Sequence, residues 1–327
     1  MKPGFAPEPI ALGPGPEFDR IREMARALGE RAQGLGDDCA LLPSTTGTLA
    51  LSTDVSVERV HFHFDWITAA EAGWRAAATA LSDLAAEGAE PFGLLAAITV
   101  PEGGVDAELT ALAGGIGAAA GAVGAAVLGG DLSRGPAWSV AVTVIGRAER
   151  PVTRAGARPG DSVWVTGVLG GARAAVTAWT RGEAPAPDAR RAYAHPEPRI
   201  AAGRWLAAHG ARAMLDLSDG LGADAAHLAA ASGVRVRLAL EHVPVAAAVI
   251  AEARRLAMPV QQFAAEGGDD YELLVALPAE FSEGGVREFE SATGIALTHV
   301  GTVERGSGVR AELLGRVLEL RGYDHFR

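Results

Sequence analysis

The sequence predicts an α/β protein built of two domains. Helix-like and strand-like segments alternate along both halves of the chain, a pattern typical of α/β or α+β architecture. A chain of 327 residues is long enough for two domains of roughly 150 residues each. Residues 150–161 contain two prolines and two glycines and separate the halves. We therefore expect a loose Pro/Gly-rich arm over 1–16, a first domain over 17–150 and a second domain over 151–327.

The first half contains three candidate helices and three candidate strands. Apolar residues at helical spacing predict a helix from residue 17, and small residues predict another over 106–125. A helix that begins near residue 69 is expected to end at Gly88 and Pro91, because both residues interrupt helices. Apolar runs predict strands over 48–54, 93–100 and 138–146.

The second half repeats the alternation of strand and helix. Strands are predicted over 162–167, 213–218, 234–240 and 270–278. Helices are predicted after Gly170 and Gly171, from residue 199, over 221–232 and over 246–257. The proline-rich segment 181–198 is predicted to be a loop.

Composition excludes several classes of partner. A formal net charge of −11 disfavours nucleic acids and anionic membranes, and no apolar run is suited to a signal core or a membrane span. With 49% hydrophobic and 21% charged residues, the chain is expected to fold around a sizeable core. Cys39 is the only cysteine, which rules out an intrachain disulfide and favours a cytoplasmic location.

The near absence of lysine restricts the nucleotide chemistry that is possible. Lys2 is the only lysine, so 28 of the 29 basic residues are arginines. A P-loop and a protein-kinase site both need a lysine on the phosphates, and Lys2 does not occur in either motif. Any nucleotide must therefore be bound by arginine, main-chain amides and metal.

Aspartates recur where apolar segments meet small residues. Such aspartates are Asp37, Asp38, Asp54, Asp131, Asp216, Asp219, Asp269 and Asp270. Each one alone is compatible with a helix cap or a turn. Asp224 fits a structural role on the solvent face of the helix 221–232, whereas Asp83 lies in the middle of an apolar helix where no cap is needed.

If these corners converge, they form a metal site. Two carboxylates about 4 Å apart repel by roughly 4 kcal/mol at an effective dielectric constant of 20, so several of them together require protons or cations. The available ligands are carboxylate, hydroxyl and carbonyl oxygens, which Mg²⁺ prefers. Mg²⁺ is usually completed by water and phosphate oxygens, so the pattern indicates a site for several Mg²⁺ ions and a phosphate.

Eight motifs in a fixed order resemble those of the thiamine-monophosphate kinase family. They are GDDCALL, STDVSVERVHF, LSDLAAEGA, GGDLSRG, VTRAGARPGD, DLSDGL, GGDDYEL and GYDHF. The resemblance implies a two-domain PurM-like fold, in which the strands of the first domain pair across a homodimer. It also implies transfer of the γ-phosphoryl group of ATP to thiamine monophosphate, giving thiamine diphosphate and ADP without a covalent enzyme intermediate.

The resemblance also implies roles for individual residues. The implied Mg²⁺ ligands are Asp38, Ser52, Thr53, Asp54, Asp83, Asp131, Asp216 and Asp219. Of these, Asp54, Asp83, Asp131 and Asp216 are expected to act in catalysis. The implied nucleotide contacts are Gly130, Asp131, Arg154 and Ser218. The implied contacts with thiamine monophosphate are His61, Asp269 and Tyr323.

Several alternatives remain open. Asp269 takes the place of a glutamate that the family commonly has, so its contact with the thiamine ring is either direct or water-mediated. Arg154 also fits a solvated linker arginine, and His61 an ordinary half-buried histidine. Two other functions compete: another ATP-dependent enzyme of the superfamily, similar to aminoimidazole-ribonucleotide synthetase, or a non-catalytic nucleotide-binding dimer.

Overall fold

The architecture is seen in a computed structural model that describes residues 11, 13–16, 18–22, 37–44 and 47–323. Most of the predicted arm 1–16, the helix beyond residue 22 and the last four residues lie outside the described part. Among the described residues, no helix has the length and apolar character needed to cross a bilayer.

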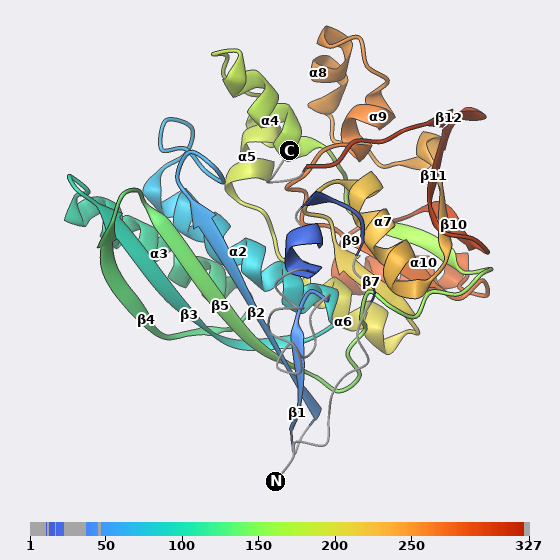
Figure 1. Ribbon diagram of the computed structural model, residues 1–327, viewed down its shortest axis with the longest axis horizontal. Coiled ribbons are helices and arrows are strands. Elements are labelled where there is room, and N and C mark those ends of the chain that lie inside the picture. Colours follow the sequence, from blue (N-terminus) through green and yellow to red (C-terminus); the bar gives the residue numbers. More distant parts are fainter. Residues whose placement is uncertain (1–10, 12, 17, 23–36, 45–46, 324–327) are drawn as a thin grey trace.

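The first half forms a five-stranded sheet in the order β1-β2-β5-β3-β4. The strands are β1 (Ala40–Ser44), β2 (Gly47–Val57), β3 (Glu90–Pro101), β4 (Ala126–Gly135) and β5 (Ser139–Ala148). All neighbouring strands are antiparallel except β3 and β4, which run parallel and are joined by a helix. Helices α2 (Ala69–Ala86) and α3 (Asp106–Ala122) lie behind this sheet in the view of Figure 1.

Helix α2 is the central element of the first half because small residues let it pack on both sides. Its start is a capping box, in which Thr68 and Glu71 each bind the main-chain N–H of the other. At Gly73 a Cβ atom would lie 1.9 Å from the carbonyl oxygen of Leu112 in α3, so only glycine allows this approach. From Ala72 onward the alanines of α2 are buried.

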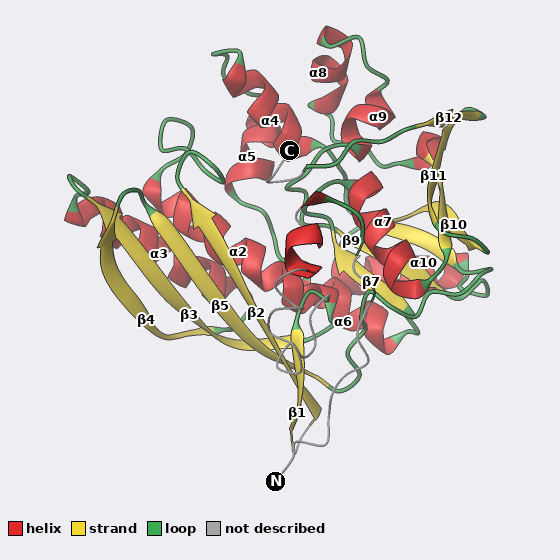
Figure 2. Cartoon of the chain, viewed as in Figure 1, coloured by secondary structure: helices red, strands yellow, loops and turns green. Residues whose placement is uncertain are grey.

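The second half forms a seven-stranded sheet in the order β12-β11-β8-β10-β6-β9-β7. Its strands are β6 (Ser162–Thr166), β7 (Ala213–Asp216), β8 (Arg235–Ala239), β9 (Leu273–Leu277), β10 (Leu297–Glu304), β11 (Gly308–Leu313) and β12 (Arg316–Leu318). Its helices are α4 (Gly171–Thr180), α5 (Pro187–Ala194), α6 (Ile200–Ala208), α7 (Leu221–Ser232), α8 (Val249–Arg255), α9 (Val260–Ala265) and α10 (Glu283–Thr293), with a short 3₁₀ turn, η2 (Leu240–His242). Figure 2 shows α7 and α10 beside this sheet.

Polar contacts join the two halves along α2. Arg190 of α5 forms two hydrogen bonds to the carboxylate of Glu71, at 2.7 and 2.8 Å. The indole N–H of Trp74 donates to the carbonyl oxygen of Pro196 at 2.9 Å. These contacts place the second half against the end of α2 where the helix begins.

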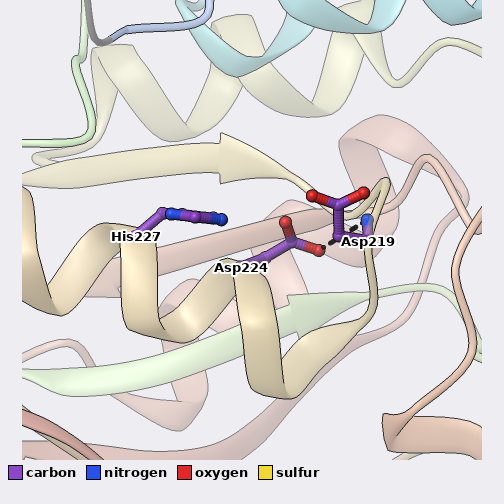
Figure 3. Close-up of side chains that lie close together, drawn as sticks. All are labelled: Asp219, Asp224 and His227. Carbon is purple, nitrogen blue, oxygen red and sulfur yellow. Dashed lines mark hydrogen bonds between the residues drawn. The ribbon is translucent and has the colours of Figure 1, made fainter. Parts of the chain in front are cut away.

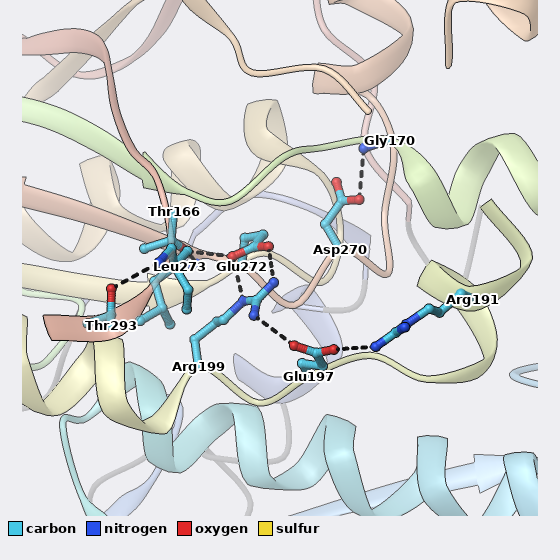
Figure 4. Close-up of polar contacts among 10 residues, drawn as sticks. Thr166, Gly170, Arg191, Glu197, Arg199, Asp270, Glu272, Leu273 and Thr293 are labelled. Atoms are coloured by element: carbon cyan, nitrogen blue, oxygen red, sulfur yellow. Dashed lines mark hydrogen bonds and ion pairs between the residues drawn. The ribbon is translucent and has the colours of Figure 1, made fainter. Parts of the chain in front are cut away.

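A buried polar network supports the loop that precedes β9 (Figure 4). Glu272 accepts hydrogen bonds from Arg199, at 2.6 and 2.9 Å, and from the hydroxyl of Thr166 at 2.6 Å. Asp270 accepts the main-chain N–H of Gly170 at 2.8 Å. The loop 267–271 is therefore held at two points. Thr166 and Arg199 bind Glu272 directly after the loop, and Gly170 binds Asp270 within it.

Most predicted elements are confirmed, and several of them differ at their ends. The sequence did not predict strands β1, β4, β10, β11 and β12 or helices α5, α9 and α10. The segment 181–198 is not a continuous loop, because α5 lies within it and begins with Pro187 in its first turn, where a proline is tolerated. Asp131 was expected where an apolar segment meets small residues, but it lies inside strand β4, which continues to Gly135. Likewise, β2 continues three residues beyond Asp54.

Candidate active site

A cavity of about 1370 Å³ is lined by residues of both halves. The first half contributes the residue pair before β1, strand β2 and helix α2. The second half contributes helix α4, the turn after β7 and the loop before β9. The cavity-lining residues that the motifs predicted are Asp38, Ser52, Asp54, His61, Asp83, Arg154, Asp216, Ser218, Asp219, Asp269 and Tyr323.

Three aspartates far apart in the sequence converge on one point of this cavity. Carboxylate oxygens of Asp38, Asp83 and Asp216 all lie within 4.8 Å of one another. They come from the residue pair before β1, from α2 and from the end of β7. The predicted convergence of acidic corners from both halves is therefore present in the fold.

Strand β2 adds further oxygens on the side that faces α2. Ser52 and Asp54 are two residues apart and so share one face of the strand. The hydroxyl of Ser52 donates to the carboxylate of Asp83, which places this face against the cluster. Burial and then charge repulsion from Asp54 raise the pKa of Asp83, so the two carboxylates interact across the gap between strand and helix.

The cluster holds more negative charge than its surroundings neutralise. Burial, followed by repulsion from Asp38, raises the pKa of Asp54 to about 6 and that of Asp216 to about 7. Burial and the charges of Asp54, Asp216 and Asp38 raise the pKa of Asp83 well above its usual value. Such a group of carboxylates favours either protons or bound cations.

Arg154 is the arginine that pairs directly with this cluster. Its guanidinium forms a two-pronged ion pair with the carboxylate of Asp38, through Nε at 3.1 Å and Nη2 at 2.5 Å. Its main-chain N–H donates to Asp37 at 3.0 Å. The geometry excludes the alternative of a solvated linker arginine, because the side chain is 17% exposed and lines the cavity.

The turn after β7 is built by Asp224 (Figure 3). Its carboxylate accepts the main-chain N–H groups of Asp219 and Gly220, at 3.2 and 3.0 Å. The structural role predicted for Asp224 is confirmed, but its predicted place on a solvent face is wrong, since the residue is 2% exposed. The bonds to Asp224 fix the turn whose Ser218 and Asp219 line the cavity.

Three predicted site residues do not reach the cavity in a single chain. The hydroxyl of Thr53 lies 2.8 Å from that of Thr143 on β5, on the face of β2 opposite to Asp54. Gly130 and Asp131 lie in the exposed edge strand β4, where Asp131 pairs with Ala97 of β3. Their proposed contacts with metal and nucleotide stay predictions.

The remaining predicted residues lie farther along the cavity wall. The side chain of His61 accepts the main-chain N–H of Val57 at 3.0 Å. Tyr323 donates its main-chain N–H to Asp219 at 3.0 Å, so the C-terminal segment passes beside the turn after β7. Tyr323 is 52% exposed.

Sequence reasoning missed Arg75, which lies eight residues before Asp83 on α2. Its guanidinium forms an ion pair with Asp269 at 2.6 Å and lies 4.1 Å from the ring centre of Tyr193. The same oxygen of Asp269 accepts the hydroxyl of Tyr271 at 2.9 Å. A charged residue in an alanine-rich helix is expected to face solvent. The only signal in the sequence for a partner of Arg75 is the acidic loop 267–271.

An aromatic group also lines this part of the cavity. The rings of Trp66 and Trp179 stack at 5.1 Å with an angle of 4° between their planes. Tyr193 packs edge-on against Trp179 at 5.2 Å. Of these three residues, Trp66 and Tyr193 line the cavity, as do His63 and Met258. One region of the cavity is therefore acidic and the other is aromatic.

Comparisons with known proteins agree with this arrangement. Residues 36–148 match the family model of the AIR synthase related protein N-terminal domain, and residues 158–313 match that of the C-terminal domain. These two matches define the class, a two-domain protein with the PurM-like fold that the motifs predicted.

Within this class, the curated relatives of this chain are thiamine-monophosphate kinases. The thiamine-monophosphate kinase of Halobacterium salinarum is 38% identical over 304 residues, which cover 93% of this chain and 98% of the relative. That of Mycobacterium tuberculosis is 35% identical over 266 residues, 80% of each chain. The chain belongs to the thiamine-monophosphate kinase family.

Solved structures support the same assignment. The structure of AaThiL complexed with AMPPCP and TMP has a TM-score of 0.85 and 31% identity, and the match covers 95% of this chain and 97% of that one. A HypE–HypF complex, at a TM-score of 0.75 and 18% identity, shares the fold alone.

Proposed function

We propose that this chain transfers the γ-phosphoryl group of ATP to thiamine monophosphate, giving thiamine diphosphate and ADP. The observation that carries the proposal is the cavity between the halves, in which carboxylates of Asp38, Asp83 and Asp216 converge beside an aromatic wall. The family membership supports the choice of substrate and of ATP as co-substrate.

The donor set of the acidic region fits Mg²⁺. The proposed metal-binding residues that line the cavity provide only oxygen atoms, which Mg²⁺ prefers. These residues are Asp38, Ser52, Asp54, Asp83, Asp216 and Asp219. Arg154 is the one cation that pairs directly with this group among the described residues. When bound, Mg²⁺ would neutralise the phosphates of both reactants. Thr53 can join this set only through its main-chain oxygen, because its hydroxyl faces away.

The protein groups act by positioning the reactants. The attacking oxygen belongs to the phosphate of thiamine monophosphate, which is largely ionised near pH 7, so no strong general base is required. Three regular elements fix where the phosphates meet, because they hold the carboxylates in place. Asp54 lies on β2, Asp83 on α2 and Asp216 at the end of β7. Arg154, held by its two-pronged ion pair with Asp38, supplies positive charge beside these carboxylates. We assign nucleotide contacts to Arg154 and Ser218.

The aromatic region suits the rings of thiamine. His61, Asp269 and Tyr323 all line the cavity, and we assign the substrate to their side. One oxygen of Asp269 is occupied by Arg75 and Tyr271, which leaves the second oxygen to accept a hydrogen bond from an amino group. The stacked rings of Trp66 and Trp179 border the same space.

A coupled assay for ADP with the purified chain tests the proposal. ADP is expected to form only when thiamine monophosphate, ATP and Mg²⁺ are all present, with thiamine diphosphate produced in equal amount. Thiamine in place of thiamine monophosphate serves as the control, because it lacks the attacking phosphate. ATP binding without any thiamine diphosphate would instead support the non-catalytic dimer, and turnover of another phosphorylated substrate would support an enzyme similar to aminoimidazole-ribonucleotide synthetase.

We further propose that the chain is a homodimer that pairs through its first sheet. Among the described elements, none covers the sheet face opposite to α2 and α3 (Figure 2). On this face Val55 and Leu95 are 50% and 41% exposed. The edge strand β4 exposes Val127, Leu128 and Leu132. An apolar face and an unpaired edge strand together favour association with a second copy. Gly130 and Asp131 lie on this edge, so a dimer is where their predicted contacts can be made.

Light scattering tests this proposal. The expected mass in solution is twice the 33.5 kDa of one chain. Leu95→Glu is expected to shift the protein toward the mass of a single chain, because it places a charge on the paired face. Leu256→Glu is the matched control, as Leu256 is 45% exposed and directly follows α8, away from this sheet. A wild-type mass of one chain, or no effect of Leu95→Glu, would contradict it.

The proposed function also involves a cellular location and a boundary between the two domains. We propose a cytoplasmic protein whose domains meet near residue 150, with no nucleic-acid or membrane partner. The first sheet ends at Ala148 and the second begins at Ser162, which supports that limit. The single cysteine, Cys39, is buried and suits a core position in a reducing compartment.

A further inference from the structure

Glu87 is a buried carboxylate that no side chain of the described residues binds by a hydrogen bond. It follows the last residue of α2 and is 0% exposed. Among the described residues, only the main-chain N–H of Cys39 lies near this carboxylate as a donor, outside good hydrogen-bond geometry, and it offsets the buried charge only in part. A buried charge with no partner is costly, so the fold must provide a counter-charge or a proton.

The groups around Glu87 increase the negative charge. Oxygens of Asp37, Asp38 and Glu87 lie within 4.8 Å of one another. One oxygen of Asp37 accepts the main-chain N–H groups of Asp38 and Arg154, and the other is buried and has no partner. Partnerless oxygens of Asp37 and Glu87 thus lie together in the interior.

In the part of the chain that the structure describes, the positive charge beside these carboxylates is insufficient. Arg154 pairs with Asp38, so three carboxylates against one guanidinium leave two negative charges. The end of α2 adds the negative pole of the helix, and its last turn has no basic residue.

We propose that Asp37 and Glu87 hold one divalent cation of the hard, oxygen-binding class, such as Mg²⁺ or Mn²⁺, with Asp38 beside it. This site differs from the cluster of Asp38, Asp83 and Asp216 and touches it only through Asp38. Asp37 and Asp38 line the cavity, so an ion enters from that side, whereas Glu87 lies behind them. The proposed ion belongs to the protein itself and does not depend on the proposed kinase activity.

Counting Mn²⁺ ions on the nucleotide-free protein tests the site. The protein is stripped with EDTA and dialysed, and free Mn²⁺ is followed by electron paramagnetic resonance during titration. Wild type is expected to bind one ion more than Glu87→Gln, or to bind it at least tenfold more tightly. Glu90→Gln is the matched control, because Glu90 is exposed only three residues away. It is expected to bind as wild type does.

Melting temperatures separate the cation from a proton. If Glu87 holds a cation, Glu87→Gln melts higher than wild type without metal and gains less from Mn²⁺. If Glu87 is simply protonated, Glu87→Gln keeps the full Mn²⁺ count and the full gain, and the proposal is overturned. Should Glu87→Gln fail to fold, Asp37→Asn is measured in the same way, and an unchanged ion count in that variant overturns the proposal equally.

Discussion

Asp83→Asn is expected to lower kcat by roughly 10³-fold or more, equivalent to about 4 kcal/mol of transition-state stabilisation. The carboxylate of Asp83 lies at the centre of the cluster, within 4.8 Å of oxygens of Asp38 and Asp216. Asparagine keeps the size and an oxygen that accepts from Ser52, but removes the charge that a metal ion requires. Steady-state kinetics with saturating ATP and Mg²⁺ measure the loss.

Stability distinguishes a functional role of Asp83 from a structural one. Since the carboxylate is buried among like charges, its removal is expected to leave the metal-free melting temperature equal or higher. Asp188→Asn, an exposed aspartate on α5, is the matched control and should change neither activity nor stability. An active Asp83→Asn variant, or one that is inactive because it is unfolded, would contradict the assignment.

The metal-free protein is expected to lose about 2–4 kcal/mol of unfolding free energy between pH 5 and pH 8. Burial and neighbouring charges raise the pKa of Asp54 to about 6 and those of Asp37 and Asp216 to about 7. These groups bind protons in the folded state that the unfolded chain has released above about pH 4. The stability is therefore present at low pH and is lost as pH rises through the folded pKa values.

Urea denaturation at several pH values measures this loss. His227 acts in the opposite direction below its usual pKa, because burial lowers its pKa to about 4, but it is a single group. Saturating Mg²⁺ is expected to remove most of the decline, since it binds the ionised carboxylates, so its stabilising effect should be larger at pH 8 than at pH 5. Asp216→Asn should flatten the metal-free profile. A stability that rises steadily from pH 5 to pH 8 without metal would refute the account.

Much of the candidate site was predictable because its chemistry is local to short motifs. Asp38, Asp83 and Asp216 were identifiable as excess carboxylates, and Asp83 stood out because a mid-helix aspartate has no capping role. Their convergence depends on the packing of α2 against two sheets, which spacing alone does not encode. The alternation of side chains along β2 already separates Thr53 from Ser52 and Asp54, so its outward hydroxyl could have been anticipated.

Other features required the folded chain. Arg75 lies in an alanine-rich helix and Glu87 directly follows it, where the pattern suggests solvent, yet both residues are buried. Helix α2 is enclosed by α3, the first sheet and the second half. The prediction of a solvent-facing Asp224 was wrong for the same reason, because the face of α7 that carries this residue is also buried. Helix α5 was missed because it lies within the proline-rich segment 181–198. Its eight residues are too few to show a clear apolar periodicity.

The most direct test of a single metal-filled cavity is a crystal structure with Mn²⁺ and a non-hydrolysable ATP analogue, with manganese located by anomalous scattering. The account predicts manganese peaks within about 2.5 Å of carboxylate oxygens of Asp83 and Asp216, with the phosphates of the nucleotide on the other side of the ions. Nucleotide bound elsewhere, or phosphates in the cavity with no manganese against these two aspartates, would contradict it.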